Sequence, residues 1–282
     1  MDGEKKKGGC LKVFLIVLLV IVIVGAIAGG IFYTKYNKAK EEQEQKNRTT
    51  TYVGRECPEF EVTTTDGKTV TKSELLDGKE VLCIVMFATW CGPCEREFPA
   101  MDKVYQKYQD KLSMIALDVD EQDDEEAAKE YADSHGLAFP IAKAEKDVLG
   151  DMGPSGYPTT LIIDRNGKVV LHRIGGIPYE EDFEKIVTTF MGDDYQERPL
   201  AYYTFIAYTK DEVIPGVEFT VTNETGTETY VTGEDGAVGV FNDKPEDMKI
   251  KVTKVPDGYK IEGNGEMTSG IGSTYMQLPV GK

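Results

Sequence analysis

Two cysteines, at positions 91 and 94, are the residues of this sequence best suited to chemistry. They lie in the stretch FATWCGPC at 87–94, which follows an apolar run over 81–87 and precedes a segment of helical period over 95–108. A continuous apolar run of this length is typical of a strand that is buried on both faces. The pattern therefore predicts a central strand that delivers both thiols to the first turn of a helix.

A helix N-terminus favours thiol chemistry. Its unpaired amides and its dipole stabilise negative charge, which lowers the pKa of a thiol placed there. The thiolate is the species that attacks a disulfide, and a second nearby thiol resolves the mixed disulfide. We predict that Cys91 is the nucleophile, that Cys94 is the more buried resolving thiol, and that the two form a redox-active disulfide. Pro93 fits the first helical turn, where its missing N–H leaves no bond unmade.

The same two cysteines are also compatible with half of a zinc site. Such a site needs a second pair of ligands. The remaining cysteines and histidines are not in ligand spacing; they are Cys10, Cys57, Cys83, His135 and His172. We therefore expect no metal and no other cofactor, and we interpret Cys83, inside the apolar strand, as a small core residue.

Three further motifs surround the dithiol. They are GRECPEF at 54–60 with DGK at 66–68 and GK at 78–79, Glu97 and Pro99 in the pattern C-x-x-C-x-x-E-x-P, and GYPTT at 156–160 followed by DRNG at 164–167. Together they resemble the TlpA/ResA-like branch of the thioredoxin superfamily over residues 52–191. The resemblance implies an α/β fold with a central mixed sheet flanked by helices, acting on protein thiols and disulfides.

The resemblance also assigns the surroundings of the dithiol. Pro158 should be in the cis form, with its loop facing Cys91 and the backbone of Tyr157 free to pair with an extended substrate segment. Trp90 should pack beside the cysteines and present a flat apolar surface to the substrate; the alternative is ordinary core packing, which applies to part of the ring in any case. Glu97 should tune the thiols and accept the proton of the resolving cysteine. The alternative for Glu97 is an ordinary carboxylate on the exposed face of the helix.

The elements of this domain follow from local pattern. Asp66-Gly67 and Asn166-Gly167 predict hairpin turns, and Ser73 is a candidate cap for a short helix that ends before Gly78. The predicted strands span 60–63, 68–71, 81–87, 112–119, 159–163 and 168–174, and the predicted helices span 95–108, 125–134 and 180–191. The acid-rich run over 118–126 is interpreted as a loop and a first helical turn.

The N-terminal region predicts a membrane anchor. Residues 11–33 are apolar apart from Lys12 and are long enough to cross a bilayer as one helix. The alternative is a cleaved signal peptide with Ala26-Ile27-Ala28 at the cleavage site. The apolar run continues past that point, which favours an uncleaved anchor, with residues 1–10 in the cytoplasm and 34–51 as a polar tether. We expect a single-pass cell-membrane protein whose catalytic domain is extracytoplasmic.

The pattern changes after the domain that spans 52–192. From Tyr202 onward, short runs rich in Val, Thr, Tyr and Phe alternate with glycine-bearing turns, which predicts a small antiparallel sandwich. Segments 215–221, 232–236 and 255–259 resemble the prealbumin-like SpaA/Cna-B repeats of Gram-positive surface proteins. We place a linker at 193–200 and this β-sandwich at 201–282. We expect few contacts across the linker, and the sandwich could hold a cell-surface partner.

Charge and motif together narrow the function. The net charge of −17 argues against a nucleic-acid partner. The predicted activity is thiol–disulfide exchange, in the reducing direction because Gly92-Pro93 is the dipeptide of reducing thioredoxins. A reductant outside the cell needs a transmembrane electron donor.

The alternatives are a DsbA-type dithiol oxidase and a surface interaction protein whose sandwich binds the partner. The P-x-x-x-T-x-x-C pattern of peroxiredoxins is absent, since Ile84 stands seven residues before Cys91.

Overall fold

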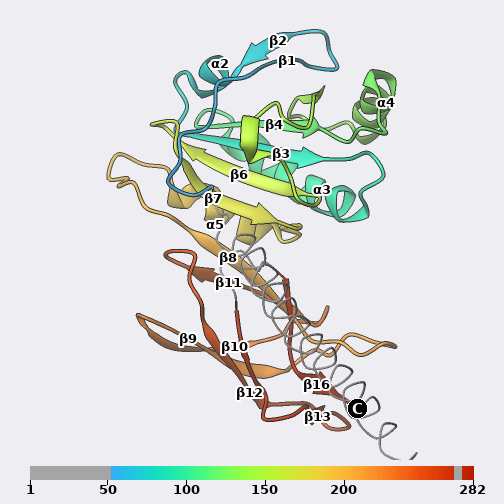
Figure 1. Cartoon of the computed structure of the whole chain (residues 1–282), viewed down its shortest axis with the longest axis vertical. Helices are drawn as coiled ribbons and strands as arrows, with labels where there is room; N and C mark the ends of the chain where they lie inside the picture. The colour runs from blue at the N-terminus through green and yellow to red at the C-terminus, as the bar shows by residue number, and fades with distance from the viewer. Residues whose placement is uncertain (1–51, 270–274) are drawn as a thin grey trace, which may run out of the picture. The chain divides into compact units, whose positions relative to one another are not determined.

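A computed structural model of the chain describes residues 52–269 and 275–282 (Figure 1). The predicted cytoplasmic N-terminus at 1–10, the predicted anchor at 11–33 and the predicted tether at 34–51 all lie outside these residues. Within the described part of the chain, no helix is long and apolar enough to cross a membrane.

A five-stranded mixed sheet carries the dithiol. Its strand order is β5-β4-β3-β6-β7, where β4 runs parallel to β3 and to β5, and β6 runs antiparallel to β3 and to β7. The strands are β3 (Val81–Phe87), β4 (Leu112–Asp118), β5 (Ile141–Lys143), β6 (Thr159–Asp164) and β7 (Val169–Ile174). All seven residues of the central strand β3 are buried. The predicted α/β thioredoxin-like fold is confirmed.

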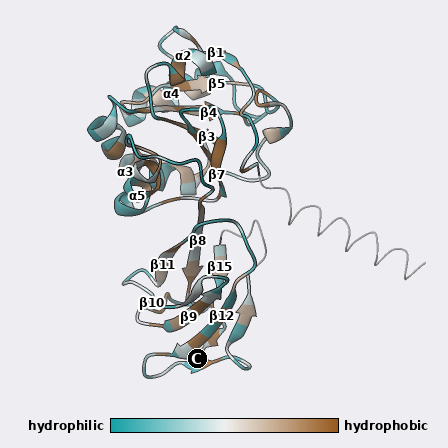
Figure 2. Ribbon diagram, turned by 90° about the vertical axis from the view of Figure 1, so that its left-hand side faces the viewer, coloured by the Kyte–Doolittle hydropathy of each residue, from teal (hydrophilic) through white to brown (hydrophobic). Residues whose placement is uncertain are grey.

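Helices cover the sheet and complete its core. Helix α3 (Gly92–Tyr108) follows β3, α4 (Glu125–His135) follows β4, and α5 (Glu180–Thr189) lies beside α3 (Figures 1 and 2). Alternate residues of β3 point to opposite sides, as the two-residue period of a strand requires. Val81, Cys83 and Val85 face the cluster that includes α3 and α5, whereas Leu82 and Ile84 face a second apolar cluster. The resulting sheet is buried on both faces.

One cap differs from its prediction. The hairpin β1 (Glu61–Thr63) and β2 (Thr69–Thr71) leads into α2 (Lys72–Leu76), whose N-cap is Thr71 and not Ser73. Thr71 Oγ1 accepts from the Glu74 amide at 3.2 Å, and the Thr71 amide donates to the Glu74 carboxylate at 2.9 Å. This reciprocal capping box satisfies two donors at once. Ser73 instead donates to the Glu59 carboxylate.

The C-terminal region is built of strands. One sheet has the order β11-β8-β15 and the other β10-β9-β12-β14, with a small β13-β16 pair beside them. The strands are β8 (Ala201–Ile206), β9 (Glu218–Asn223), β10 (Gly226–Val231), β11 (Ala237–Asn242), β12 (Lys249–Lys254), β13 (Lys260–Ile261), β14 (Glu266–Thr268), β15 (Tyr275–Gln277) and β16 (Val280–Gly281). Residues from both sheets share one apolar cluster, so the region is a two-layer β-structure.

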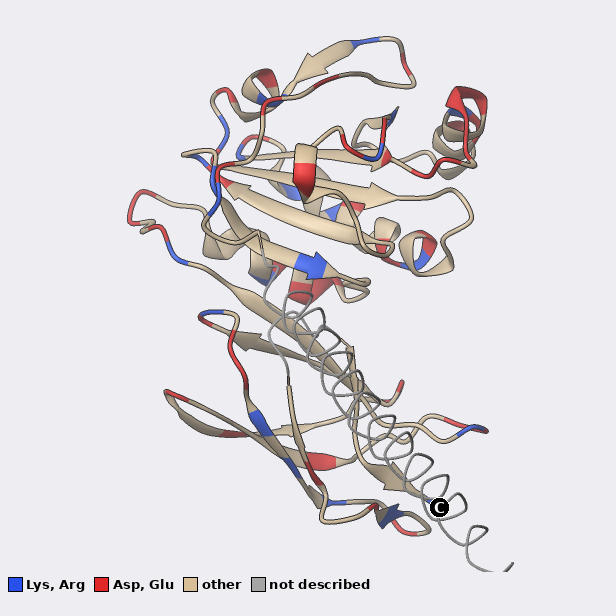
Figure 3. Ribbon diagram, viewed as in Figure 1, with Lys and Arg blue, Asp and Glu red and all other residues tan. Residues whose placement is uncertain are grey.

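Charged side chains are largely kept out of the interior. Figure 3 shows Lys and Arg interspersed with Asp and Glu along loops and helices, while β3 and β6 are mostly uncharged. Among the described residues, the charged side chains that are at most 1% exposed are Glu97, Asp118, Asp164 and Arg173. Burying a charge is costly unless partners compensate it, so these four positions mark places where the tertiary structure supplies such partners or shifts a pKa.

Strand β8 joins the C-terminal region to the redox domain, which corrects the expectation of few contacts across the linker. Leu200 and Tyr202 belong to the core cluster that contains Cys91 and Cys94, whereas Tyr203 belongs to the core of the C-terminal region. The Leu200 amide also donates to the Val170 carbonyl at 2.8 Å. Because side chains alternate along a strand, β8 serves both cores.

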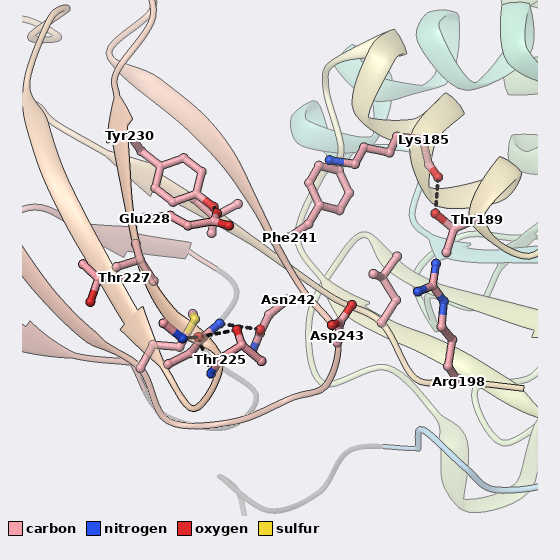
Figure 4. Close-up of a pocket in the computed structure, with 16 residues that line it drawn as sticks. Lys185, Thr189, Arg198, Thr225, Thr227, Glu228, Tyr230, Phe241, Asn242 and Asp243 are labelled. Atoms are coloured by element: carbon pink, nitrogen blue, oxygen red, sulfur yellow. Dashed lines mark hydrogen bonds between the residues drawn. The ribbon is translucent and has the colours of Figure 1, made fainter.

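A second contact lies between α5 and β11. Lys185 Nζ stands 4.0 Å from the centre of the Phe241 ring, and Figure 4 shows the two side chains facing one another. They border a cavity of about 390 Å³, which is also lined by Arg198 and Tyr230. The two regions therefore meet along a surface that includes both apolar and polar contacts.

Candidate active site

Cys91 and Cys94 form a disulfide at the start of α3. Cys91 is the N-cap residue of the helix, and its Sγ accepts from the Cys94 amide at 3.2 Å. Its own amide donates to the carbonyl of Ala88, the residue that follows β3. Cys91 is 4% exposed and Cys94 is 0% exposed. The structure thus places the two cysteines where the sequence predicts them, with Cys91 the more accessible sulfur and a helix N-terminus available to stabilise its thiolate.

An exposed aromatic residue stands next to the dithiol. Trp90 is 61% exposed, and its ring contacts Tyr157 edge-on with the ring centres 5.9 Å apart. The Tyr157-Pro158 bond is cis, as predicted, and the Pro158 carbonyl accepts from the Gly175 amide at 2.7 Å. The Trp90–Tyr157 contact therefore brings the cis-proline loop beside the dithiol. An exposed ring flanked by a buried disulfide suits the docking of an extended segment.

Glu97 is buried one turn after Cys94, so it is not a carboxylate on the exposed face of the helix. It is 0% exposed; its Oε2 accepts from the Ile177 amide at 2.6 Å, and its Oε1 has no hydrogen-bond partner among the described residues. Burial raises the pKa of Glu97 to about 8, while the Ile177 amide and Arg173 oppose the increase. A carboxyl with such a pKa can exchange a proton near neutral pH, and residues three apart share one side of a helix.

The raised pKa of Glu97 predicts a pH-dependent stability. Glu97 retains its proton in the folded state up to a pKa of about 8, whereas its ordinary value is 4.5. Between these values the folded state binds more protons, so this contribution to stability is full below pH 4.5 and declines by up to about 1.4 kcal/mol per pH unit as the pH rises to 8. Urea unfolding of the oxidised protein should show the decline. Glu97→Gln should remove it, and the exposed Glu95→Gln should not; equal slopes in all three proteins would contradict the prediction.

Two buried charged residues near the site are not among the predicted site residues: Asp118 enters the sequence analysis only as the start of the acid-rich run 118–126, and Arg173 does not enter it. Asp118 ends β4, opposite Phe87, with Lys143 Nζ 3.9 Å from its carboxylate. Burial raises the pKa of Asp118 to about 7. Arg173 lies in β7 and is 1% exposed. In both cases one feature of the sequence indicates a buried charge: a charged residue stands within an apolar run or at its end.

The other two described cysteines are not equipped for exchange. Cys57 and Cys83 are free and 0% exposed, and Cys83 is the core residue that the sequence predicts. Burial raises the pKa of Cys57 to about 11 and that of Cys83 well above its ordinary value. Both stay protonated thiols, which react slowly with disulfides.

This chain is similar in sequence to known thiol-disulfide oxidoreductases. The AhpC/TSA family matches residues 53–172. A thiol-disulfide oxidoreductase ResA of Bacillus thuringiensis is 38% identical over 152 residues, covering 53% of this chain and 82% of the relative. The thioredoxin-like protein YneN of Bacillus subtilis is 35% identical over 136 residues, covering 47% and 78%. A solved structure of a DsbE-type thiol:disulfide interchange protein from Chlorobium tepidum aligns with TM-score 0.42 and 29% identity, covering 48% and 93%.

The fold and the disulfide at the start of α3 define a thioredoxin-like redox protein. Its relatives narrow the class further: the chain belongs to the ResA-like family and is a thiol–disulfide oxidoreductase.

Proposed function

We propose that this protein is a membrane-anchored, extracytoplasmic reductase of protein disulfides. The observation that carries the proposal is the Cys91–Cys94 disulfide at a helix N-terminus, beside the exposed ring of Trp90 and one turn before the buried Glu97. The catalytic residues are Cys91, Cys94 and Glu97, and the substrate-binding residues are Trp90, Tyr157 and Pro158.

The reaction starts from the reduced dithiol. The Cys91 thiolate attacks one sulfur of a substrate disulfide, which forms a mixed disulfide and releases the first substrate thiolate. Cys94 then loses its proton to the Glu97 carboxylate and attacks the Cys91 sulfur, which releases the second substrate thiolate. Two electrons have moved to the substrate, and the protein is left with its disulfide. A transmembrane electron donor must then reduce Cys91–Cys94.

The direction of electron flow is tested by the reduction potential. Gly92-Pro93 between the cysteines and the likeness to ResA support a reductant; a DsbA-type oxidase is the alternative. Equilibration with defined thiol–disulfide buffers should give a potential nearer to about −270 mV, as in thioredoxin, than to about −120 mV, as in DsbA. A potential close to the second value would favour the oxidase.

The location is tested with intact protoplasts. The apolar segment at 11–33 supports an anchor with the redox domain outside the cell. Added protease should then remove the redox domain while the anchor stays with the membrane. Protection until the membrane is broken would reverse the orientation, and release of a fragment that begins near Gly29 would indicate a cleaved signal peptide.

The C-terminal region supplies a second part of the proposal. Its resemblance to SpaA/Cna-B repeats over 201–279 supports a cell-surface partner that it holds near Cys91, which raises the effective concentration of substrate. A Cys94→Ser variant, which accumulates mixed disulfides, should capture extracytoplasmic proteins. Capture of cytoplasmic proteins alone would contradict this part of the proposal. If the surface partner binds equally to wild type and to Cys91→Ser and no exchange follows, the interaction protein is the better description.

A further inference from the structure

Arg173 lies buried between the redox domain and the C-terminal region. On one side its guanidinium donates to the carbonyls of Gly175 and Gly176, at 3.1 and 3.0 Å. On the other side it donates to the Tyr202 carbonyl and to Thr204 Oγ1, both at 2.8 Å. Both acceptors on this second side belong to β8. The C-terminal region therefore supplies part of the shell that allows a charge to be buried here.

Tyr275, on β15, contacts the same loop. Its hydroxyl donates to the Gly176 carbonyl at 3.0 Å, and its ring centre stands 4.8 Å from the Arg173 guanidinium. The ring of Tyr202 lies 4.6 Å from the same guanidinium. Gly176 thus accepts hydrogen bonds from two side chains, one of which belongs to the C-terminal region.

The loop that these bonds hold is the one that binds Glu97. Ile177, the next residue after Gly176, donates its amide to Glu97 Oε2 at 2.6 Å. The approach is close: a Cβ added at Gly176 would lie 3.3 Å from Glu97 Oε2, 3.5 Å from the Tyr275 hydroxyl and 3.6 Å from the Pro93 carbonyl. A short chain of contacts therefore connects β8 and β15 to the carboxylate behind the dithiol.

We propose that the C-terminal β-region is a structural part of the redox site, in which Tyr275 and Arg173 are positioning residues that hold Gly176-Ile177 against Glu97. The inference rests on the proton-accepting role proposed above for Glu97. It gives the C-terminal region a function inside the redox site, in addition to the binding of any partner.

Several titratable groups face Glu97, and the direction of the expected effect follows from them. Arg173 on β7 favours the charged carboxylate, as does the Ile177 amide. Cys83 on β3 and Tyr131 on α4 are buried neutral groups whose pKa values the Glu97 charge helps to raise; the dithiol lies on the same helix. If Gly176-Ile177 is held less firmly, the Ile177 amide forms a weaker hydrogen bond with Glu97, and the charged Glu97 carboxylate is less stabilised. The pH at which Glu97 ionises should then rise.

The test compares hydroxyl deletions in the whole chain. Tyr275→Phe removes the bond to Gly176 and keeps the ring beside Arg173. Tyr259→Phe is the control, because it removes a tyrosine hydroxyl in the same region whose exposed bond goes to Glu212 and not to Gly176. The pH dependence of exchange with a small disulfide and the potential of Cys91–Cys94 are the two readouts. Tyr275→Phe should move the midpoint of the profile up by about 0.5 pH unit, which is about a threefold loss of ionised Glu97 below the midpoint.

Two further variants keep the test decisive. Gly176→Ala inserts a methyl group between Glu97 and Tyr275. It should also move the midpoint of the pH profile up. If Tyr275→Phe folds poorly, Gly176→Ala provides the same test. In a Glu97→Gln background, Tyr275→Phe should have no further effect on the profile or the potential, because the coupling passes through the carboxylate.

The outcomes separate the inference from the proposed function. If Glu97→Gln flattens the profile while Tyr275→Phe and Gly176→Ala match wild type, the inference is wrong and the role of Glu97 stands. If Glu97→Gln leaves the profile unchanged, both are wrong. The inference also fails if Tyr259→Phe shifts the midpoint equally, or if Tyr275→Phe keeps its effect in the Glu97→Gln background.

Discussion

Replacement of Cys91 by serine should reduce disulfide exchange to the uncatalysed rate. Cys91 is the more accessible sulfur and lies at the helix N-terminus, where its thiolate is stabilised. A serine hydroxyl does not ionise near neutral pH and cannot attack a disulfide. Insulin reduction in the presence of dithiothreitol should therefore fall by about 10²-fold or more, since an essential nucleophile is removed.

The second cysteine should give a different result. In Cys94→Ser the attack by Cys91 is retained and the resolving step is lost, so mixed disulfides with substrate should accumulate and be visible on non-reducing gels. Cys57→Ala is the matched control, because Cys57 is free and fully buried, and its turnover should equal wild type. Turnover that survives in Cys91→Ser would refute the assignment of the nucleophile.

Removal of the residues after Gly192 should destabilise the redox domain. Leu200 and Tyr202 leave its core cluster in such a chain, and Arg173 loses the acceptors on β8. Loss of two buried apolar side chains corresponds to about 3–6 kcal/mol of the free energy of unfolding. Urea unfolding should show the loss, and activity on a small disulfide should fall with the folded fraction.

Two point variants test whether the buried side chain of Tyr202 contributes to the stability of the redox domain. Tyr202→Ala removes a side chain that is 3% exposed, whereas Tyr208→Ala, in the same region, removes one that is 41% exposed. The first should cost about 3 kcal/mol and the second less than about 0.5 kcal/mol. If the chain that ends at Gly192 unfolds at the wild-type urea concentration, the redox domain is an independent module, as the linker predicted at 193–200 implies.

Local pattern was sufficient for the elements that carry the dithiol. The apolar run at 81–87 became β3 without a change of boundary, and Asn166-Gly167 joins β6 to β7 as predicted. In both cases the determining information lies within a few adjacent residues: continuous apolar side chains for a doubly covered strand, and positive φ at Gly167 for the tight turn. The short helix near residue 73 follows from the same local information, but its N-cap is Thr71, two residues before the predicted Ser73, because Glu74 completes a capping box with Thr71.

What the sequence determined by itself is therefore the chemistry: two thiols at a helix start, a cis-proline loop, and a glutamate one turn beyond. Only the tertiary structure determines how deeply these groups are buried and which residues surround them. The spacing of Glu97 places it on α3, but its burial depends on Ile177, eighty residues later in the chain. The charge of Arg173 gives no indication of its distant partners, because these come from β8 and β15, in a region that the sequence separates from the redox domain. Burial and the pKa shifts that follow from it are set by contacts between distant segments, and no periodicity within a single segment encodes them.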